Sequence, residues 1–544
     1  MPQDMPPLPL DPACFGQGAA QHVELLQTHI GWVYLLDEYA IKLKKAVKFD
    51  FLDFSTLEGR RWACEREVTL NRRLCPHLYL GIVPVFRAGS QTWVELAASR
   101  DLPGNSPLSG MVSAKNAAAE LVDWAVWMKR LPSERMLNVL LDAQTATSSD
   151  FEHIADLLGE FYRRQRGSIP AGGLGDLDAV KINVDENLRE GWALDRHVLS
   201  EGSLCLIECR ARRFLSKYGV MIQQRAREGF IVDGHGDLRA ENICIPSPAD
   251  GPPLLFDCIE FNDRFRIADS ALDVAYLAME LDSRARTDLG NAFLERYKKN
   301  CDPNLPKKLF NFYLGYRAFV KGKVAAWIGM DKQVECKQRE SSLSQARHLF
   351  DLAVRYALLD EPALLVFCGP AGSGKSTLAS ELAARLNFKH IATDYLRDCF
   401  VPRGAAPEQR YASAISAQVY QALINKAAEC LDSGESVILD GTFGTAANRK
   451  RAAELARERN AACVLIWADC APAAALEHVA ARTASGQCFG SEAGAGVAAA
   501  QQLSFEMPQP DEGFRAVCRI DTSTTLHESK QKAWEEIMAA LAAR

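Results

Sequence analysis

The feature that most constrains this chain is the apolar run Leu364-Leu-Val-Phe-Cys, which leads directly into Gly369-Pro-Ala-Gly-Ser-Gly-Lys-Ser-Thr377. A short continuous apolar run is typical of a strand buried on both faces of a parallel sheet. The run that follows has the spacing G-x-x-x-x-G-K-[ST], in which glycines allow backbone N–H groups to converge on phosphate oxygens at the start of a helix. This segment therefore predicts an α/β domain that binds a nucleoside phosphate.

The phosphate loop assigns a role to each of its residues. Lys375 is expected to reach the outer phosphates of ATP, where it would also serve catalysis, and the Ser376 hydroxyl is expected to ligate Mg²⁺. A glycine turn that caps a helix by chance is the weaker alternative, because a strand precedes the loop and a helix follows it. The predicted ATP-binding residues of the loop are Gly369, Gly372, Gly374, Lys375, Ser376 and Thr377.

Two carboxylates follow at positions that suit phosphoryl transfer. Asp394 comes after Ile391-Ala-Thr, and Asp440 ends the apolar run that starts at Val437. Because the carboxyl ends of parallel strands line the ligand crevice, both are expected near the bound phosphates. One can accept the proton of a substrate hydroxyl, and the other can hold Mg²⁺ or its water. Helix N-capping is the ordinary alternative for either aspartate taken singly.

These motifs, with Arg397, Arg449 and Arg482, resemble the polynucleotide-kinase and gluconate-kinase-like branch of the P-loop kinases, within the AAA family ATPases. The resemblance implies transfer of the ATP γ-phosphoryl group to a hydroxyl, with Asp394 as the catalytic base. It implies that Arg397 and Arg449 bind the acceptor, and that Arg482 stabilises the transferring charge from a lid over residues 483–496. Apart from the resemblance, a solvated helix face accounts equally well for Arg449 and for Arg482.

A second constellation lies earlier in the chain, in His235-Gly-Asp237-Leu-Arg-Ala-Glu-Asn242 followed by Leu255-Phe-Asp257. Phosphoryl transfer to a hydroxyl needs a carboxylate beside the acceptor and oxygen ligands for Mg²⁺ on the ATP phosphates. We expect Asp237 to be the catalytic base and Asn242 and Asp257 to be the metal ligands.

A lysine upstream completes this set. Tyr39-Ala-Ile-Lys42 has the pattern of a strand whose lysine pairs with ATP phosphates and with a glutamate of the adjoining helix, for which we choose Glu67. Lys44 lies on the same strand face as Lys42, so only the motif favours Lys42. Glu65 likewise competes with Glu67.

Residues 21–350 together resemble the aminoglycoside phosphotransferase and choline-kinase superfamily. The whole arrangement is similar to a bacterial family in which such a domain is fused to a P-loop ATPase. The chain departs from the pattern at Arg239, where many members have a second histidine, and it has no glycine-rich loop between Ile30 and Lys42. No residue points to an antibiotic as the acceptor.

The expected architecture has two domains, α+β and then α/β. A flexible, Pro- and Gly-rich arm over 1–20 precedes a protein-kinase-like bilobal domain over 21–355. A small β-rich lobe with one helix begins this domain, and a mostly helical pattern runs from about Asp123 to Arg355. Glu361-Pro362 marks the boundary, after which a P-loop domain over 361–544 has a parallel sheet flanked by helices.

Chain length, net charge and cysteine pattern limit the classes of function that the chain can have. A chain of 544 residues exceeds one hydrophobic core, its net charge is −6, and its 16 cysteines include no Cys-x-x-Cys pair. We therefore expect a cytoplasmic enzyme without a membrane segment, with ATP and Mg²⁺ as cofactors and small hydroxylated molecules as acceptors. A polynucleotide acceptor for the second module stays open, although the acidic balance argues against it. A regulator in which one module binds ATP without catalysis also stays open.

Overall fold

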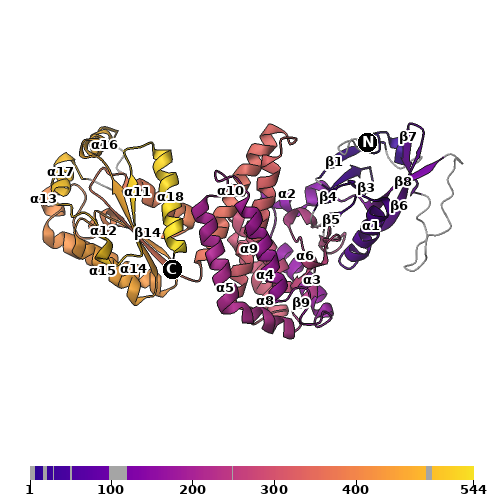
Figure 1. Cartoon of the computed structure of the whole chain (residues 1–544), viewed down its shortest axis with the longest axis horizontal. Helices are drawn as coiled ribbons and strands as arrows, with labels where there is room; N and C mark the ends of the chain where they lie inside the picture. Colours follow the sequence, from indigo (N-terminus) through magenta and orange to yellow (C-terminus); the bar gives the residue numbers. More distant parts are fainter. Residues whose placement is uncertain are drawn as a thin grey trace. The chain divides into compact units, whose positions relative to one another are not determined.

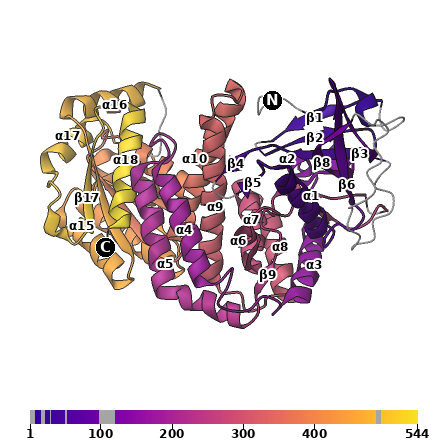
Figure 2. The same cartoon turned by 45° about the vertical axis from the view of Figure 1, so that its right-hand side comes forward.

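The computed structural model describes residues 7–15, 21–28, 30–49, 52–96, 119–247, 249–485 and 493–543. They form two compact units, one made of residues 1–180 and 220–306, and the other of residues 181–219 and 307–544. Figures 1 and 2 show the elements of each unit. The second unit thus contains the P-loop segment and helical residues that precede the boundary predicted at Glu361, and the boundary itself stays a prediction.

The first unit opens with a mixed-length antiparallel sheet in the order β1-β2-β3-β8-β6-β7. The strands β2 and β3 form a hairpin that turns at Asp37 and Glu38, and the one helix predicted for this lobe packs as α1 against β6 and β8. Figure 1 shows α1 along one face of this sheet. Its elements are β1 (Glu24–Gln27), β2 (Gly31–Leu35), β3 (Tyr39–Lys44), α1 (Leu57–Asn71), β6 (Tyr79–Ala88), β7 (Gln91–Val94) and β8 (Glu120–Lys129), with the small hairpin of β4 (Lys48–Phe49) and β5 (Leu52–Asp53).

Two expectations for this region are wrong. The helical pattern predicted from Asp123 begins later, because residues 120–129 form β8 between β3 and β6, where cross-strand burial overrides local pattern. Residues 7–15 of the predicted flexible arm are packed: Leu8 and Phe15 are buried in the sheet's core, and the Tyr34 hydroxyl donates to the Leu8 carbonyl over 2.9 Å. Composition indicated flexibility, whereas two apolar side chains anchor the segment.

The rest of the first unit is mainly helical, with short strand pairs that hold the loops. The strand β9 pairs with β12, and β10 pairs with β11 on the two sides of the predicted catalytic loop. The elements are η3 (Ser133–Arg135), α2 (Leu137–Asp142), α3 (Ser148–Gln165), β9 (Ile231–Asp233), η4 (Ala240–Asn242), β10 (Ile243–Cys244), β11 (Leu254–Leu255), α6 (Asp263–Arg266), β12 (Ile267–Asp269), α7 (Ser270–Ser283) and α8 (Thr287–Asn300).

Four long helices supply a helical layer in the second unit. The helices α9 (Lys307–Met330) and α10 (Cys336–Leu358) pack together, and parts of α4 (Leu177–Trp192) and α5 (Glu201–Arg227) join them. This layer contacts two helices of the P-loop segment. Trp534 donates to the Ser203 hydroxyl over 2.8 Å, and Arg385 forms a two-pronged ion pair with Asp351.

The remainder of the second unit is a five-stranded parallel sheet in the order β14-β15-β13-β16-β17, as the sequence predicts for a P-loop domain. Helices α11 and α18 contact one another and the sheet, and α14 and α15 do the same (Figure 1). The elements are β13 (Ala363–Cys368), α11 (Lys375–Leu386), β14 (Lys389–Ala392), α12 (Thr393–Arg397), α13 (Pro407–Arg410), α14 (Ser413–Asp432), β15 (Val437–Asp440), α15 (Ala446–Glu458), β16 (Ala462–Asp469), α16 (Pro472–Ser485), α17 (Ala495–Ser504), η5 (Pro510–Glu512), β17 (Ala516–Asp521) and α18 (Leu526–Ala542).

Every residue of β13 is buried, which explains why the strand reads as one apolar run. Across the described part of the chain, none of the helices has the length and apolar character needed to cross a membrane.

Candidate active sites

The phosphate loop lies between the end of β13 and the start of α11, and its glycines are required by its geometry. Gly369, Gly372 and Gly374 have φ values of +142°, +84° and +81°. A Cβ atom on Gly372 would lie 2.1 Å from the Ala475 carbonyl oxygen. Residues with a side chain rarely adopt positive φ, and no side chain fits beside the Ala475 carbonyl. The glycines therefore leave the loop backbone accessible, so that its N–H groups can face a ligand.

Ser376 and Asp440 come together at the carboxyl end of the sheet. The Ser376 hydroxyl donates to Asp440 Oδ1 over 3.2 Å, and the Asp440 side chain is almost fully buried. His390, which the sequence analysis did not single out, places Nε2 3.4 Å from Asp440 Oδ2. Two oxygen ligands beside a phosphate loop fit Mg²⁺, which prefers oxygen and keeps several waters.

Lys375 and Asp394 are available to a ligand. Both are half-buried, and within the described ranges neither side chain has a hydrogen-bond or ion-pair partner. Lys375 begins α11 directly after the loop, and Asp394 lies in the first turn of α12, just past β14. Thr377 is exposed on α11. The fold thus leaves an ammonium and a carboxylate uncommitted in the P-loop domain.

The three predicted arginines have different surroundings. Arg397 is buried, donates through Nη1 to the Arg410 carbonyl over 2.7 Å and stacks on Tyr411, while its Nε has no partner among the described atoms. Arg449 is fully buried and forms a two-pronged ion pair with Glu512, with N–O distances of 2.5 and 2.7 Å. The side chain of Arg482 and most of the predicted lid lie outside the described residues.

Arg449 also donates to the Phe443 carbonyl over 2.8 Å, so each of its three guanidinium nitrogens has a partner within the protein. In this structure Arg449 therefore fixes the loop after β15 to η5. The buried ion pair with Glu512 gives Arg449 a structural contact, and its predicted role in acceptor binding stays a prediction.

In the first unit, Lys42 of β3 bridges two carboxylates. Its Nζ lies 2.9 Å from Glu67 on α1 and 2.5 Å from Asp257. Burial disfavours the Lys42 ammonium, but Asp257 and Glu67 outweigh this effect and raise its pKa. Burial acts to raise the pKa of Asp257, yet the nearby Lys42 ammonium prevails and lowers it to about 2.

The structure separates the competing residues that the motif alone could not. Glu67 is fully buried, whereas Glu65 is paired with Arg61 on the exposed side of α1. Lys44 is also fully buried and contacts both Glu67 and Glu260. Burial, only partly offset by the Lys44 ammonium, raises the pKa of Glu260. Lys44 thus pairs with one carboxylate oxygen of Glu67, while Lys42 pairs with the other and connects Glu67 to Asp257.

The loop that follows β9 gathers the predicted base and metal ligand. Asn242 Nδ2 donates to Asp237 Oδ2 over 3.1 Å, and Arg239 Nε lies 3.0 Å from the same oxygen. Arg239 also contacts Glu241. Arg239, where many members of the resembled superfamily have a histidine, therefore contacts the carboxylate of the predicted base Asp237.

Two acidic residues of α7 support this loop, and the sequence analysis missed both. Asp273 accepts from the backbone N–H of His235 over 2.7 Å and of Gly236 over 2.9 Å. Glu280 accepts from the N–H of Ala240 over 2.6 Å. The one signal for them is that two acids lie seven positions apart on a largely apolar helix, which places them on one face.

One family-model match lies in the P-loop region of the chain. Residues 364–508 match the family model described as AAA domain. Parts of the chain are similar to solved structures of a sugar kinase from Janibacter sp. (19% identity, 34% of this chain and 99% of that one, TM-score 0.27) and of a gluconokinase from Sinorhizobium meliloti (20%, 33% and 92%, 0.24). The APS kinase of Mycobacterium tuberculosis, solved with AMPPNP and APS, is 16% identical (34% and 99%, 0.25).

Relatives from two Mycobacterium species match nearly the whole chain. Uncharacterized protein Rv2004c of Mycobacterium tuberculosis and uncharacterized protein Mb2027c of Mycobacterium bovis are each 32% identical over 519 residues. The match covers 94% of this chain and 95% of each relative. Because the similarity extends through both units, the chain belongs to the family that these full-length mycobacterial proteins represent.

Proposed function

We propose that this protein is a bifunctional ATP-dependent phosphotransferase that moves the γ-phosphoryl group to hydroxyl groups of small molecules. The observation that carries the proposal is the P-loop site. There the Ser376 hydroxyl lies 3.2 Å from Asp440, and Lys375 and Asp394 have no partner among the residues that the structure describes. Oxygen ligands, a free ammonium and a free carboxylate are the groups that phosphoryl transfer to a hydroxyl requires.

In the P-loop unit, loop N–H groups and Lys375 hold the phosphates of ATP. Asp394 accepts the proton of the acceptor hydroxyl while the hydroxyl oxygen bonds to the γ-phosphorus. The bond between the γ-phosphorus and the bridging oxygen of the β-phosphate breaks and releases ADP. Mg²⁺, held by Ser376 and Asp440, would neutralise phosphate charge. Arg397, the predicted acceptor-binding residue, would hold the acceptor through its Nε, which has no partner within the described part of the chain.

In the first unit, we propose an active site of the aminoglycoside phosphotransferase and choline-kinase type. The support is the chain of contacts from Glu67 through Lys42 to Asp257, next to a loop that presents Asp237 and Asn242. Lys42 would contact ATP phosphates, and Asp237 would accept the acceptor's proton. Asn242 and Asp257 supply the oxygen atoms for Mg²⁺, which would again offset phosphate charge.

Turnover by single-site variants of the full chain tests the proposal. ADP release would be measured with labelled ATP and fractionated metabolite pools as acceptor sources, for the unmodified protein, Asp237→Asn and Lys375→Ala. Each variant should abolish the products of its own unit and leave those of the other. Matched controls are Asp250→Asn and Lys389→Ala, which change exposed residues of the same two units.

Equal turnover in all five proteins would refute both site assignments. If Lys375→Ala abolished all turnover while Asp237→Asn changed none, the first unit would be a nucleotide-binding regulator. Calorimetry with Mg·ATP separates these cases, because a regulator still takes up nucleotide at the first site.

A further inference from the structure

An arginine contacts the predicted catalytic base of the first unit. Arg239 Nε lies 3.0 Å from Asp237 Oδ2, and Asn242 Nδ2 donates to the same oxygen over 3.1 Å. The Asp237 carboxylate, more than any other group, raises the pKa of Arg239, as expected for an ion pair. Both side-chain contacts of the base therefore fall on one of its two oxygens.

The other oxygen of Asp237 is open to a ligand. Within the described part of the chain, Oδ1 has no hydrogen-bond partner, and the Asp237 side chain is 25% exposed. A carboxylate that takes a proton needs an oxygen that is free of donors and within reach of the acceptor hydroxyl. Oδ1 meets this requirement, whereas Oδ2 is already occupied.

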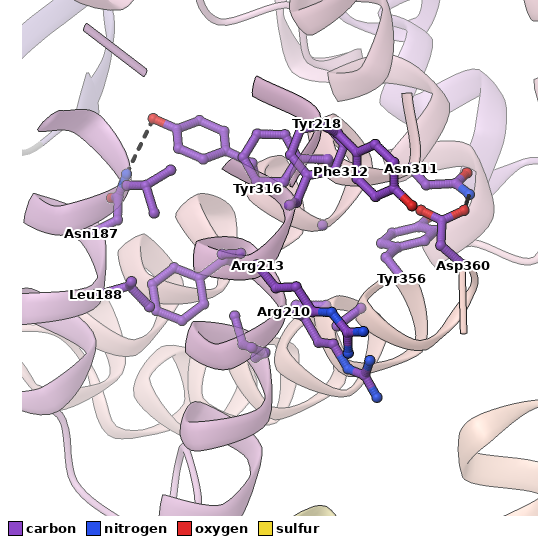
Figure 3. A pocket seen from close by; sticks show the side chains of 18 of the residues that line it. Asn187, Leu188, Arg210, Arg213, Tyr218, Asn311, Phe312, Tyr316, Tyr356 and Asp360 are labelled. Carbon is purple, nitrogen blue, oxygen red and sulfur yellow. Dashed lines mark hydrogen bonds between the residues drawn. The ribbon is translucent and has the colours of Figure 1, made fainter. Parts of the chain in front are cut away.

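A carboxylate that is paired on both oxygens occurs in the second unit. Arg210 contacts Glu361 Oε2, and Arg213 Nη1 lies 3.0 Å from Glu361 Oε1. Figure 3 shows both arginines at the wall of a cavity of about 100 Å³ in the helical layer. Because Glu361 has a cation on each oxygen, neither oxygen is left to take a proton. Asp237 differs, because its side-chain contacts fall on Oδ2.

The backbone next to Arg239 is fixed, so its guanidinium has a defined place. The Arg239 N–H donates to the Asp237 carbonyl over 2.9 Å, and the Arg239 carbonyl accepts from the Asn242 N–H over 2.9 Å. Arg239 Nη1 also lies 3.1 Å from Glu241 Oε2. The guanidinium is thus held between two carboxylates of its own loop, and it can hold Asp237 in one orientation.

We propose that Arg239 is a positioning residue of the first unit, whose charge holds Oδ2 of Asp237 so that Oδ1 faces the acceptor hydroxyl. This inference rests on the function proposed above for that unit. During transfer, Oδ1 takes the proton of the hydroxyl while the hydroxyl oxygen bonds to the γ-phosphorus. The bond between the γ-phosphorus and the bridging oxygen of the β-phosphate breaks, and ADP leaves.

The contact depends on charge more than on hydrogen-bond geometry. Arg239 Nε is buried and makes no hydrogen bond to any described residue, although it lies 3.0 Å from Oδ2. Lysine keeps the positive charge on a long side chain, whereas glutamine is polar and neutral. The variants Arg239→Lys and Arg239→Gln therefore separate the effect of charge from the effect of polarity.

Turnover of the first unit would be measured as ADP release by the full chain in a Lys375→Ala background, with water and with the fractionated metabolite pools as acceptors. Arg239→Gln should lower kcat about 10- to 100-fold, the loss expected for a base displaced by about 1 Å, while KM for ATP changes less than about threefold. Arg239→Lys should keep most of kcat, because it keeps the charge. Millimolar guanidinium should restore turnover to Arg239→Ala and not to Asp237→Asn.

Arg164→Gln is the matched control and should leave kcat unchanged, because Arg164 is an exposed arginine of the same unit that pairs with Glu160. An unchanged or raised kcat in Arg239→Gln would overturn the inference. Equal losses in Arg239→Gln and Arg239→Lys, together with lost Mg·ATP binding in calorimetry, would show a purely structural role and overturn it as well. If Arg239→Gln fails to fold, Arg239→Ala decides, since absence of rescue by guanidinium contradicts a role of charge.

The same assay separates this inference from the function on which it rests. If the unmodified first unit shows no turnover that Asp237→Asn removes, the proposed function of that unit fails, and the role of Arg239 fails with it. Turnover that Asp237→Asn removes and Arg239→Gln leaves intact refutes the role of Arg239 alone.

Discussion

The fully buried pair of Arg449 and Glu512 gives a test that needs no substrate. Both side chains are almost completely inaccessible, and the guanidinium makes three hydrogen bonds, two to Glu512 and one to the Phe443 carbonyl. Replacing Arg449 by alanine leaves a buried carboxylate without its cation. Breaking a buried pair from one side costs about 3–5 kcal/mol of unfolding free energy.

The expected change in melting temperature follows from this cost. For a unit of this size, each 1 kcal/mol shifts the midpoint by roughly 2–4 °C, so Arg449→Ala should lower it by about 6–20 °C. Scanning calorimetry of the full chain would measure the shift. Hydrogen exchange of peptides from β15 and α15 would assign it to the P-loop unit.

Two further variants make the test specific. Lys450→Ala changes the exposed neighbour of Arg449 on α15 and should alter stability by less than about 0.5 kcal/mol. The double variant Arg449→Met with Glu512→Leu removes both charges and should recover at least half of the loss, since apolar replacements of buried pairs are often neutral. A normal melt for Arg449→Ala, together with weakened acceptor binding, would refute the structural role and restore the predicted acceptor contact.

Three other predictions concern the candidate sites. Glu67→Gln should weaken ATP binding at the first unit and Glu65→Gln should not, because only Glu67 contacts Lys42; calorimetry in a Lys375→Ala background would isolate that site. Gly372→Ala should abolish ATP binding at the P-loop, whereas Gly404→Ala, with a φ of +82° but open space around it, should retain ATP binding and cost about 1 kcal/mol of stability. Lys42 lowers the pKa of Asp257 from 3.8 to about 2, so this pair stabilises the fold above pH 3.8 and loses that effect as pH falls toward 2. Acid unfolding of Lys42→Met should lack this pH-dependent component, and identical acid profiles would contradict the pairing.

Local sequence patterns are sufficient to predict the phosphate loop and the strand and helix on its two sides. The strand before Gly369, the turn and the helix after it are contiguous in the chain, so local pattern predicts all three, and the family model match supports an AAA-type domain there. The placement of Asp440 at a strand end follows from the parallel sheet. Its contact with Ser376 is the consequence of β15 lying next to β13.

Other residues could not be ranked from the sequence. Glu65 and Glu67 are equally acidic and two positions apart, and only the packing of α1 on the sheet buries one and exposes the other. The strand β8 reads as part of a helical region until its pairing with β3 and β6 is known. In each case the deciding interactions come from residues far away in the chain, which local pattern does not contain.

The sequence by itself determined the chemistry-bearing motifs, because a phosphate loop and a His-x-Asp loop each require particular residues at short fixed spacings. Only the tertiary structure decided which charges pair with each other and which have no partner among the described residues. Arg449 and Lys375 are both basic residues near a phosphate site, yet one is enclosed with Glu512 and the other is left uncommitted. The physical reason is burial: a charge removed from water must find its partner within the protein, and the fold determines which partner it meets.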